Sequence, residues 1–527
     1  MFDMIQSLAI LHNIRMFGRS TEKEPMYPID FFWRAADRYP ARIAVRSPAA
    51  DLTFAELAAR VGSLAAAFAR IDPEPGSRLA IGAANSVDHL VALLAAIAAG
   101  KVWVPLNPRN GTPELERILA FTEPSIVVLD AAMRERLPGV SGHMAPLEDI
   151  EKVIREHAGS ARPALNLGLD ATQAIKFTGG TTGVPKGVMQ PMRAWNTTVL
   201  TQWHEFDFHA DDRFLVSAPL THGASTYVLA VLGSGGGLVF PPDTSAPTLL
   251  DWTAQAGVTS LFLPPTAIYA LCAEQTRAPR DVSSLRLLIY GAAPMPPARI
   301  QETQRVFGNV VATTYGQTEA PTVLTCMRPD QLADPRNLGS VGRPSMNTLV
   351  AIMGKDGTLL GPGQEGEIVA RGDLLMTGYW RMSEQTATTI VDGWLHTGDV
   401  GAFDERGFLF IKSRVREVII SGGFNVYPSD VEEAIGRHAA IYESAVVGIA
   451  DDKWGEAVHA AVQLRPGASV SPEELIGFVK REIGAVKAPK VVHIFDTLPK
   501  SPVGKTLKDE VVRRIHQQAA TQTGSKA

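Results

Sequence analysis

Short apolar runs alternate with helical segments along most of this chain, and this alternation limits the folds open to it. The runs read RLAIGA, VWVPL, SIVVLD, SLFLPP and LRLLIYGAA, and they lie near Leu79, Val102, Ser125, Ser260 and Leu285. An apolar helix is expected between the first two, from Val87 to Ala99. Strands that alternate with helices are typical of layered α/β sheets. The expected fold class is therefore α/β.

The pattern changes from about residue 325, where the turn sequences KDG, GPGQEG and DERG separate short strands such as EIVARG and FLFIK. This pattern predicts a small β-rich subdomain. After Lys412 the chain passes through a charged segment into glycines, then returns to strands (SAVVGI, AVHAAVQL, VVHIF) and a helix over residues 472–483. About a hundred residues remain there, which is enough for a small α+β domain. The polar tail after Gln517 is expected to be frayed.

The composition narrows the range of partners. A chain of 527 residues exceeds what one hydrophobic core usually organises, and a net charge of -5 gives no reason to expect a nucleic acid or an anionic membrane. The apolar run from Leu90 to Gly100 is roughly half the ~20 residues that cross a bilayer, so no integral membrane segment is expected. The partners expected are small molecules, and the sequence leaves open whether the chain forms a homodimer.

The two cysteines, Cys272 and Cys326, lie far apart and belong to no CxxC or histidine cluster. This spacing argues against a disulfide framework or a zinc site, and a reducing cytoplasm fits best. The first residues lack a basic start and a small-residue cleavage site, which argues against a secretory signal. The role of residues 1–25 stays open.

The stretch TGGTTGVPKG, from Thr178 to Gly187, holds four glycines, three threonines and one lysine. Glycines are tolerated where the backbone must approach a partner closely, and amide N–H groups, hydroxyls and an ammonium together suit phosphate. The Walker pattern is absent, because Gly187 rather than Ser or Thr follows Lys186. A flexible surface turn is the alternative, and the loop alone does not decide between them.

Four further stretches follow in order: TTYGQTEAP from Thr313, GWLHTGD from Gly393, SRVREVIISGGFNVYPSDVEEAI from Ser413, and LPKSPVGKTLKDEV from Leu498. With the glycine-rich loop they resemble the motif series of the adenylate-forming enzymes, which include acyl-CoA synthetases, adenylation domains of peptide synthetases and firefly-type luciferases. The resemblance covers nearly the whole chain. It implies a large N-terminal domain over residues 1–413, with its β-rich part at about 325–413, and a small mobile domain over 418–527. The hinge would be residues 414–417, with Arg416 and Glu417 at its centre.

The resemblance implies that a carboxylate attacks the α-phosphate of ATP, that pyrophosphate leaves, and that a thiol captures the acyl-adenylate. Such chemistry depends on holding and dispersing phosphate charge, so hydrogen-bond donors and a divalent cation matter most. The co-substrates implied are ATP and CoA, with Mg²⁺ on Glu319, since magnesium prefers oxygen ligands and phosphates. The catalytic residues implied are Lys505, Glu319, Thr178 and His222.

The nucleotide site implied by the resemblance draws on each of the motifs. The loop would hold the β- and γ-phosphates, Tyr315 would lie on the adenine, Asp399 would accept from the ribose hydroxyls and Arg414 would lie nearby. Ser413 stands where the family commonly has glycine, and Arg416 where it has Asp or Lys. The remaining nucleotide-binding residues are Gly179, Gly180, Thr181, Thr182, Gly183, Lys186, Gly291, Ala292, Ala293, Thr314, Gly316, Gln317, Thr318 and Lys505.

The thiol acceptor and the acyl group are less constrained. Gly422 and Gly423 would form a tunnel for the pantetheine arm, while Trp454, Lys487 and Lys490 would contact the rest of CoA. For the acyl pocket the resemblance indicates His222, Gly223, Ala224, Ser225, Tyr290, Gly291, Gly316 and Val323. No arginine falls at these positions, so a dicarboxylic acid is less expected than an aromatic, alicyclic or medium-chain acid.

The expected function is therefore a CoA ligase for a hydrophobic acid. A stand-alone adenylation enzyme that loads a carrier protein and a catalytically inactive nucleotide-binding regulator remain as alternatives. No carrier domain follows Lys505 in this sequence, which favours free CoA. A serine hydrolase is disfavoured because no G-x-S-x-G elbow occurs.

Overall fold

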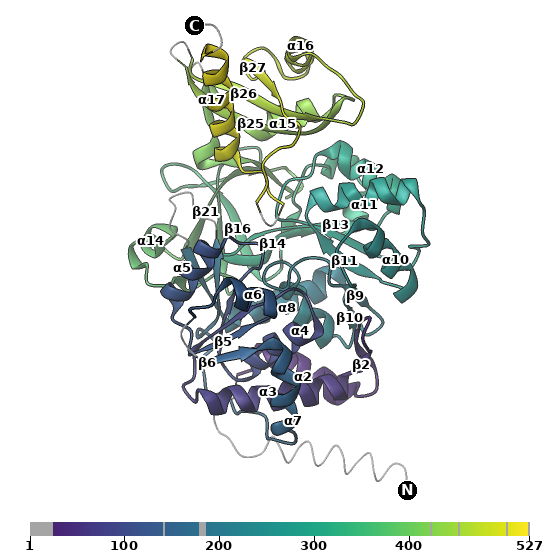
Figure 1. Ribbon diagram of the computed structural model, residues 1–527. Helices are drawn as coiled ribbons and strands as arrows, with labels where there is room; N and C mark the ends of the chain where they lie inside the picture. Colours follow the sequence, from purple (N-terminus) through teal and green to yellow (C-terminus); the bar gives the residue numbers. More distant parts are fainter. Residues whose placement is uncertain are drawn as a thin grey trace.

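The computed structural model describes residues 25–140, 143–178, 186–421, 424–451, 454–501 and 504–524. It shows a large α/β body and a smaller lobe, built from the last hundred residues, at the top of Figure 1. This division and the α/β class confirm the expected fold. Within the described ranges, no helix combines the length and the apolar composition that crossing a bilayer requires.

Two large sheets form the body. The nine-stranded sheet runs in the order β15 (Arg343–Pro344), β14 (Ala320–Met327), β13 (Val311–Gln317), β12 (Leu287–Tyr290), β11 (Ser260–Leu263), β9 (Arg213–Leu215), β10 (Gly237–Val239), β1 (Ile43–Arg46) and β2 (Leu52–Thr53). The seven-stranded sheet runs β19 (Gly378–Tyr379), β8 (Lys186–Pro191), β7 (Thr172–Thr178), β4 (Val102–Pro105), β3 (Arg78–Gly82), β5 (Ile126–Leu129) and β6 (His143–Pro146). The inner strands of both are parallel. Parallel neighbours need crossover connections, which the helices between the strands supply.

Helices surround and separate these sheets (Figure 1). In the body they are α2 (Pro28–Arg38), α3 (Phe54–Ile71), α4 (Val87–Ala98), α5 (Thr112–Thr122), α6 (Ala131–Arg136), α7 (Ile150–Glu156), α8 (Met192–Phe206), α9 (Ser225–Gly233), α10 (Ala246–Ala256), α11 (Pro265–Arg277), α12 (Pro297–Phe307), α13 (Pro329–Leu332) and α14 (Ser383–Thr389).

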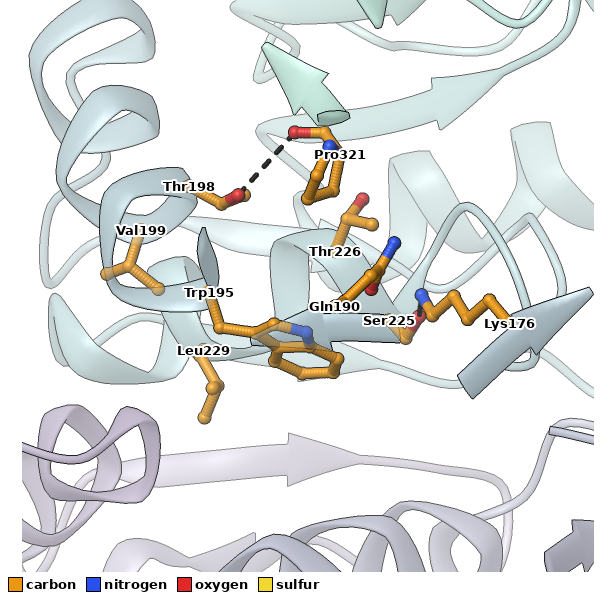
Figure 2. Close-up of a pocket in the computed structure, with 9 residues that line it drawn as sticks. All are labelled: Lys176, Gln190, Trp195, Thr198, Val199, Ser225, Thr226, Leu229 and Pro321. Atoms are coloured by element: carbon orange, nitrogen blue, oxygen red, sulfur yellow. Dashed lines mark hydrogen bonds between the residues drawn. The ribbon is translucent and has the colours of Figure 1, made fainter. Parts of the chain in front are cut away.

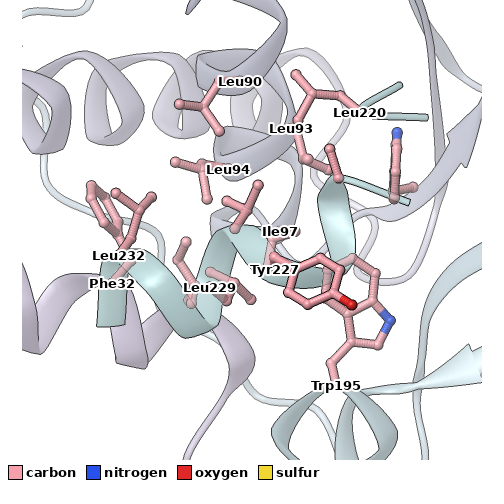
Figure 3. Packing of buried hydrophobic residues seen from close by; sticks show 14 of the residues in the cluster. Phe32, Leu90, Leu93, Leu94, Ile97, Trp195, Leu220, Tyr227, Leu229 and Leu232 are labelled. Atoms are coloured by element: carbon pink, nitrogen blue, oxygen red, sulfur yellow. The ribbon is translucent and has the colours of Figure 1, made fainter. Parts of the chain in front are cut away.

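The main core lies around α4, whose side chains are apolar on nearly every face. Such a helix is stable only when neighbours cover it on all sides. Figure 3 shows Leu90, Leu93, Leu94 and Ile97 packed against residues that include Tyr227 from α9. The core thus ties α4 to α9, and α9 carries one wall of the candidate site.

The β-rich subdomain is a six-stranded sheet, as predicted. It contains β17 (Leu359–Leu360), β16 (Thr348–Met353), β18 (Gly366–Gly372), β21 (Trp394–Phe403), β20 (Ile390–Val391) and β22 (Leu409–Arg414). The smaller lobe has five strands, β23 (Ile419–Ser421), β24 (Phe424–Val426), β25 (Ile441–Asp451), β26 (Gly455–Leu464) and β27 (Val491–Ile494), with helices α15 (Pro428–Gly436), α16 (Pro472–Ile483) and α17 (Lys508–Gly524).

One expectation about the C-terminus was wrong. The tail after Gln517 was expected to be frayed, but α17 continues to Gly524. Its first half is anchored by Val511 and Ile515, which are buried against β25. Helix formation is cooperative, so an anchored first half can carry the polar residues that follow.

Candidate active site

The glycine-rich loop connects two paired strands. Thr178 at the end of β7 lies opposite Lys186 at the start of β8 in an antiparallel register. A β-carbon on Gly187 would lie 2.9 Å from the Ile175 side chain and 3.1 Å from Phe177, so the close packing of this hairpin requires glycine. The predicted phosphate-binding residues Gly179, Gly180, Thr181, Thr182 and Gly183 lie outside the described residues.

Tyr379, which the sequence motifs did not indicate, contacts two residues of the predicted phosphate and magnesium site, Lys186 and Glu319. The Lys186 ammonium lies 5.1 Å from the ring centroid of Tyr379, and the Tyr379 hydroxyl donates a 2.8 Å hydrogen bond to Glu319 Oε1. Burial and the charge of Glu319 raise the pKa of Tyr379, which keeps the phenol protonated as a donor. The pairing of β19 with β8 places Tyr379 there. The apolar-glycine-aromatic sequence MTGYW was the available signal.

Asp399 contacts three side chains, two from β13 and one from β22. Its Oδ2 atom accepts hydrogen bonds from the Tyr315 hydroxyl (2.7 Å) and from Gln317 Nε2 (2.8 Å), while Oδ1 lies 3.3 Å from Arg414 Nε. The arginine comes from β22, directly opposite Asp399 in β21. Asp399 is only 6% exposed. Burial and the Asp399 charge raise the pKa of Tyr315. The structure therefore joins four predicted nucleotide residues in one hydrogen-bonded cluster.

The backbone around this cluster is strained and closely packed. A β-carbon on Gly316 would lie 2.6 Å from the Thr322 carbonyl carbon, and Thr322 itself has φ 71°. The Thr314 hydroxyl donates to the Thr322 carbonyl oxygen. Non-glycine residues with positive φ are uncommon, and for β-branched residues they are outliers that concentrate at functional sites.

The predicted nucleotide-binding residues Gly291, Ala292 and Ala293 lie directly after β12. Gly291 is buried between the Thr314 carbonyl and the Phe262 ring, with 3.0 and 3.1 Å left for a β-carbon. Ala292 follows with φ 67° and is exposed, and Ala293 is half-buried. Thr318 is half-buried, and its carbonyl accepts a 2.8 Å hydrogen bond from Gln190 Nε2.

The segment that carries Lys505 belongs to the small lobe but lies against the body. A β-carbon on the preceding residue, Gly504, would be 3.1 Å from Thr266 Oγ1 and 3.7 Å from Pro264. Both neighbours follow β11, which pairs with β12 and so lies beside the strand that leads to Gly291. The Lys505 amide donates to Ser501 Oγ at 3.1 Å. Lys505 is therefore placed at the edge of the sheet where the nucleotide residues gather.

His222 lies just before α9 in a half-buried position. Its Nδ1 atom is 3.1 Å from Thr221 Oγ1, and its carbonyl accepts a 2.9 Å hydrogen bond from the Ser225 hydroxyl. Burial, assisted by the charge of Lys176, lowers the pKa of His222 to about 4. The imidazole is therefore neutral at pH 7 and can shape a pocket without adding charge.

The cavity next to His222 differs from the predicted acyl pocket. Figure 2 shows that it is lined mainly by β7, β8, α8 and α9, and Ser225 alone of the predicted pocket residues is among those drawn. Phe262 occupies the space beside Gly223, where a β-carbon would have only 2.7 Å. Ala224, Tyr290 and Val323 are buried in the core.

The residues expected to meet CoA form two local groups in the small lobe. The Lys490 ammonium lies 5.0 Å from the Trp454 ring and donates to the Ala485 carbonyl at 2.9 Å. Lys487 instead pairs with Asp430 at 2.8 Å. Gly422 and Gly423 lie outside the described residues.

The predicted hinge residues lie in a short 3-10 helix, Val415–Glu417. Glu417 pairs with Lys508 at 3.3 Å, and Lys508 also reaches Glu432 at 2.9 Å. These two carboxylates raise the pKa of the half-buried Lys508 against the effect of burial. The side chain of Arg416 lies outside the described part of the chain.

Comparison with known proteins agrees with this geometry. The model of the AMP-binding enzyme family matches residues 32–380, and that of the AMP-binding enzyme C-terminal domain matches residues 430–505. A feruloyl-CoA synthase of Amycolatopsis is 36% identical over 92% of this chain and 98% of its own length. The indoleacetate–CoA ligase of Aromatoleum aromaticum is 34% identical over 91% of this chain and 96% of its own.

Solved structures give the same result. The amide bond synthetase McbA from Marinactinospora thermotolerans has a TM-score of 0.85 at 29% identity, covering 92% of this chain and 99% of its own. ATP-bound MatB from Rhodopseudomonas palustris has a TM-score of 0.85 at 29% identity, covering 93% and 99%. The chain therefore belongs to the family of AMP-binding enzymes, whose motifs it resembles. Its curated relatives place it on the acyl-CoA synthetase branch of that family.

Proposed function

We propose that this protein is an ATP-dependent CoA ligase that activates a hydrophobic carboxylic acid. The observation that carries the proposal is the position of Lys505. It belongs to the small lobe, yet its segment packs beside β11 at the edge where Gly291 and the Asp399 cluster lie. A cation delivered from a second domain to a nucleotide site suits a reaction in which phosphate charge must be held during one step only.

In the first step a carboxylate oxygen of the acid attacks the α-phosphorus of ATP, and the bond to pyrophosphate breaks. Thr178, Lys186 and the loop between them would bind the outgoing phosphates. Asp399 would accept from the ribose hydroxyls, because a carboxylate can accept about four hydrogen bonds and Asp399 has oxygens already oriented by Tyr315 and Gln317. Lys505 would contact the α-phosphate.

Glu319 fits a magnesium ion that is shared with phosphates. Among the described residues, no three His, Cys, Asp or Glu side chains gather into a metal cage. Mg²⁺ commonly uses one or two carboxylates together with substrate phosphates, so a single oriented carboxylate is sufficient. The Tyr379 hydroxyl fixes Glu319 Oε1 and leaves the other carboxylate oxygen for the ion. When bound, the ion would neutralise phosphate charge.

In the second step the CoA sulfur attacks the acyl carbonyl carbon, and the bond to AMP breaks. We propose that the small domain, residues 418–527, swings about residues 414–417 between the two steps, so that Lys505 withdraws and the face bearing Gly422 and Gly423 takes its place. The Trp454–Lys490 pair offers a ring and a cation for the adenine and phosphates of CoA. The buried free cysteines support a reducing, cytoplasmic site of action.

The acid is proposed to be aromatic, alicyclic or medium-chain. Relatives include a feruloyl-CoA synthase, an indoleacetate–CoA ligase and a medium/long-chain-fatty-acid–CoA ligase. A fatty acid–[acyl-carrier-protein] ligase from Streptomyces coeruleorubidus is also 28% identical over 91% of this chain, so a carrier protein is the alternative thiol.

The test is acid-dependent AMP formation by the purified protein with ATP, Mg²⁺ and a panel of carboxylic acids, with free CoA or a carrier protein as the thiol. We expect thioester formation on free CoA. Thioester formation on the carrier protein alone would select the alternative, and no pyrophosphate release with any acid would reject the adenylation chemistry.

A further inference from the structure

A buried lysine that the sequence motifs did not indicate lies at the cavity beside His222. Lys176 is 7% exposed and donates one hydrogen bond, of 3.1 Å, to Ser225 Oγ. An ammonium carries three N–H donors. Among the described residues Lys176 has no carboxylate partner. Its ammonium instead makes cation-π contacts, with Nζ 5.0 Å from the Trp103 ring centroid and 5.5 Å from that of Trp195. The ammonium therefore retains donors that point to the cavity (Figure 2).

Packing alone does not account for this lysine. A cation-π contact contributes less stabilisation than burying a charged group costs. Burial lowers the pKa of Lys176 to about 7, and no opposing charge among the described residues restores it. A methionine would fill the same space without that cost. A perturbed charge beside a cavity is a functional-site signal, and the geometry here supports it independently.

Other polar atoms of the cavity wall are also unsatisfied. Within the described ranges, neither the Trp195 indole N–H nor Gln190 Oε1 has a hydrogen-bond partner, and both residues line the cavity. The Gln190 orientation is fixed, because its Nε2 donates to the Thr318 carbonyl. The cavity is thus lined by two donor groups, the Lys176 ammonium and the Trp195 indole N–H, and by one acceptor, Gln190 Oε1. It has room for about one water-sized group. A hydroxyl, a carbonyl oxygen or one end of a carboxylate fits these groups, whereas an aromatic ring would not fit.

The cavity adjoins the reacting groups. Lys176 and Thr178 lie on the same face of β7, because alternate residues of a strand share a face. Their backbones are about 7 Å apart along the strand. Ser225 follows His222 by three residues, and Pro321, another wall of the cavity, follows Glu319 by two. A group bound in the cavity would therefore lie at the inner end of an acyl chain whose carboxylate is at the nucleotide.

We propose that Lys176 is a specificity residue, and that the acid carries a hydrogen-bond-accepting oxygen at the end remote from its reacting carboxylate. This inference rests on the proposed CoA ligase function and narrows its substrate class. The sequence made a dicarboxylic acid less expected because no arginine falls at the predicted pocket positions, but Lys176 supplies a cation from β7. Phenolic, keto and second carboxylic oxygens share the required chemistry.

The experiment compares matched acids in the pyrophosphate-release assay. Phenylpropenoic acids and medium-length straight-chain acids are each supplied with hydrogen, hydroxyl or carboxylate at the far end. For the wild type we expect kcat/KM to be at least about tenfold higher for an oxygen-bearing acid than for its parent, since a hydrogen bond to a charged group contributes about 1.5–3 kcal/mol. In Lys176→Met this ratio should fall close to one.

Two further variants supply a control for lysine burial and a second test of the cavity. Lys101→Met replaces another buried lysine, one held by the carbonyl of Glu74 and by Ser77, and it should leave the ratio unchanged. Trp195→Phe keeps an aromatic ring but removes the second donor, and it should lower the ratio several-fold even if Lys176→Met does not fold. The ratio compares two acids on one preparation, so it does not depend on the fraction that is folded.

The outcomes separate the two proposals. Equal kcat/KM for the parent and oxygen-bearing acids in the wild type, or an unchanged ratio in Lys176→Met and Trp195→Phe, would overturn the role of Lys176 while leaving the ligase intact. If no acid releases pyrophosphate, the ligase proposal fails first.

Discussion

At the scale of a single residue, the buried ammonium of Lys176 should lower the stability of the fold at neutral pH. Its pKa falls from 10.5 to about 7 on folding, so between these values the unfolded chain binds the extra proton. The free energy of unfolding therefore gains a contribution that rises with pH across this window, by roughly 5 kcal/mol at most. Uncompensated buried charge is often replaced by an apolar residue without loss.

We therefore predict that Lys176→Met raises the thermal unfolding midpoint by a few degrees at pH 7, with a smaller gain near pH 10. Thermal unfolding of both proteins across this pH range measures the difference. A gain that is constant with pH would show that the lysine keeps its proton in the folded state across this range, so that folding does not lower its pKa.

Lys505 is the residue for which the two half-reactions should separate. Loss of a preorganised charge donor costs about 100- to 1,000-fold in rate. Lys505→Ala should lower acid-dependent pyrophosphate exchange by that factor and spare thioester formation from supplied acyl-adenylate. Lys500→Ala serves as the control, because Lys500 pairs with Glu443 inside the small lobe. Equal loss in both half-reactions would contradict the role assigned to Lys505.

At the scale of an element, the β13–β14 hairpin holds the Asp399 cluster in place. Gly316 has no room for a β-carbon against the Thr322 backbone, and the residues on either side, Tyr315 and Gln317, both donate to Asp399. Gly316→Ala must therefore shift one strand and with it two of the Asp399 donors.

We predict that Gly316→Ala raises the KM for ATP by at least about tenfold, as expected for the loss of hydrogen bonds to a charged group. Gly168→Ala is the matched control, because a β-carbon there meets no atom within 4 Å and should leave the KM for ATP unchanged. ATP titration of the initial rate gives both values. An unaltered KM in Gly316→Ala would mean that this hairpin does not position the nucleotide.

The elements themselves could largely be predicted. Strands such as β3 and β11 and helix α16 lie where periodicity and flanking turns indicated, because each depends on local pattern. Contacts between distant segments could not be read in this way. Tyr379 bonds to Glu319 only because β19 pairs with β8. Lys176 bonds to Ser225 only because the fold places β7 next to α9. Neither residue belongs to the motifs quoted above, and the MTGYW sequence around Tyr379 does not by itself say which residues it contacts, so the tertiary structure is needed to place both residues in the site.

At the scale of the whole molecule, one arginine connects the body to the small lobe. Arg299 in α12 is 7% exposed, donates a 2.8 Å hydrogen bond to the Tyr442 carbonyl in β25, and lies 5.0 Å from the Tyr442 ring. On the body side it lies 4.7 Å from the Tyr269 ring and pairs with Glu302 at 2.7 Å. The guanidinium thus stabilises the arrangement in which the segment that carries Lys505 lies beside β11.

Because the contacts of Arg299 are with Tyr442, Tyr269 and Glu302 rather than with a predicted nucleotide residue, its loss should change domain populations rather than the reacting groups. If Arg299→Met removes about 1.4 kcal/mol from this arrangement, the ratio of the two domain arrangements changes about tenfold. Pyrophosphate exchange should then fall several-fold, while thioester formation from supplied acyl-adenylate stays equal or becomes faster. Arg437→Met is the matched control, since Arg437 pairs with Glu433 and Glu482 inside the small lobe and should alter neither half-reaction. A parallel fall in both half-reactions would show that Arg299 supports folding and not the choice between domain arrangements.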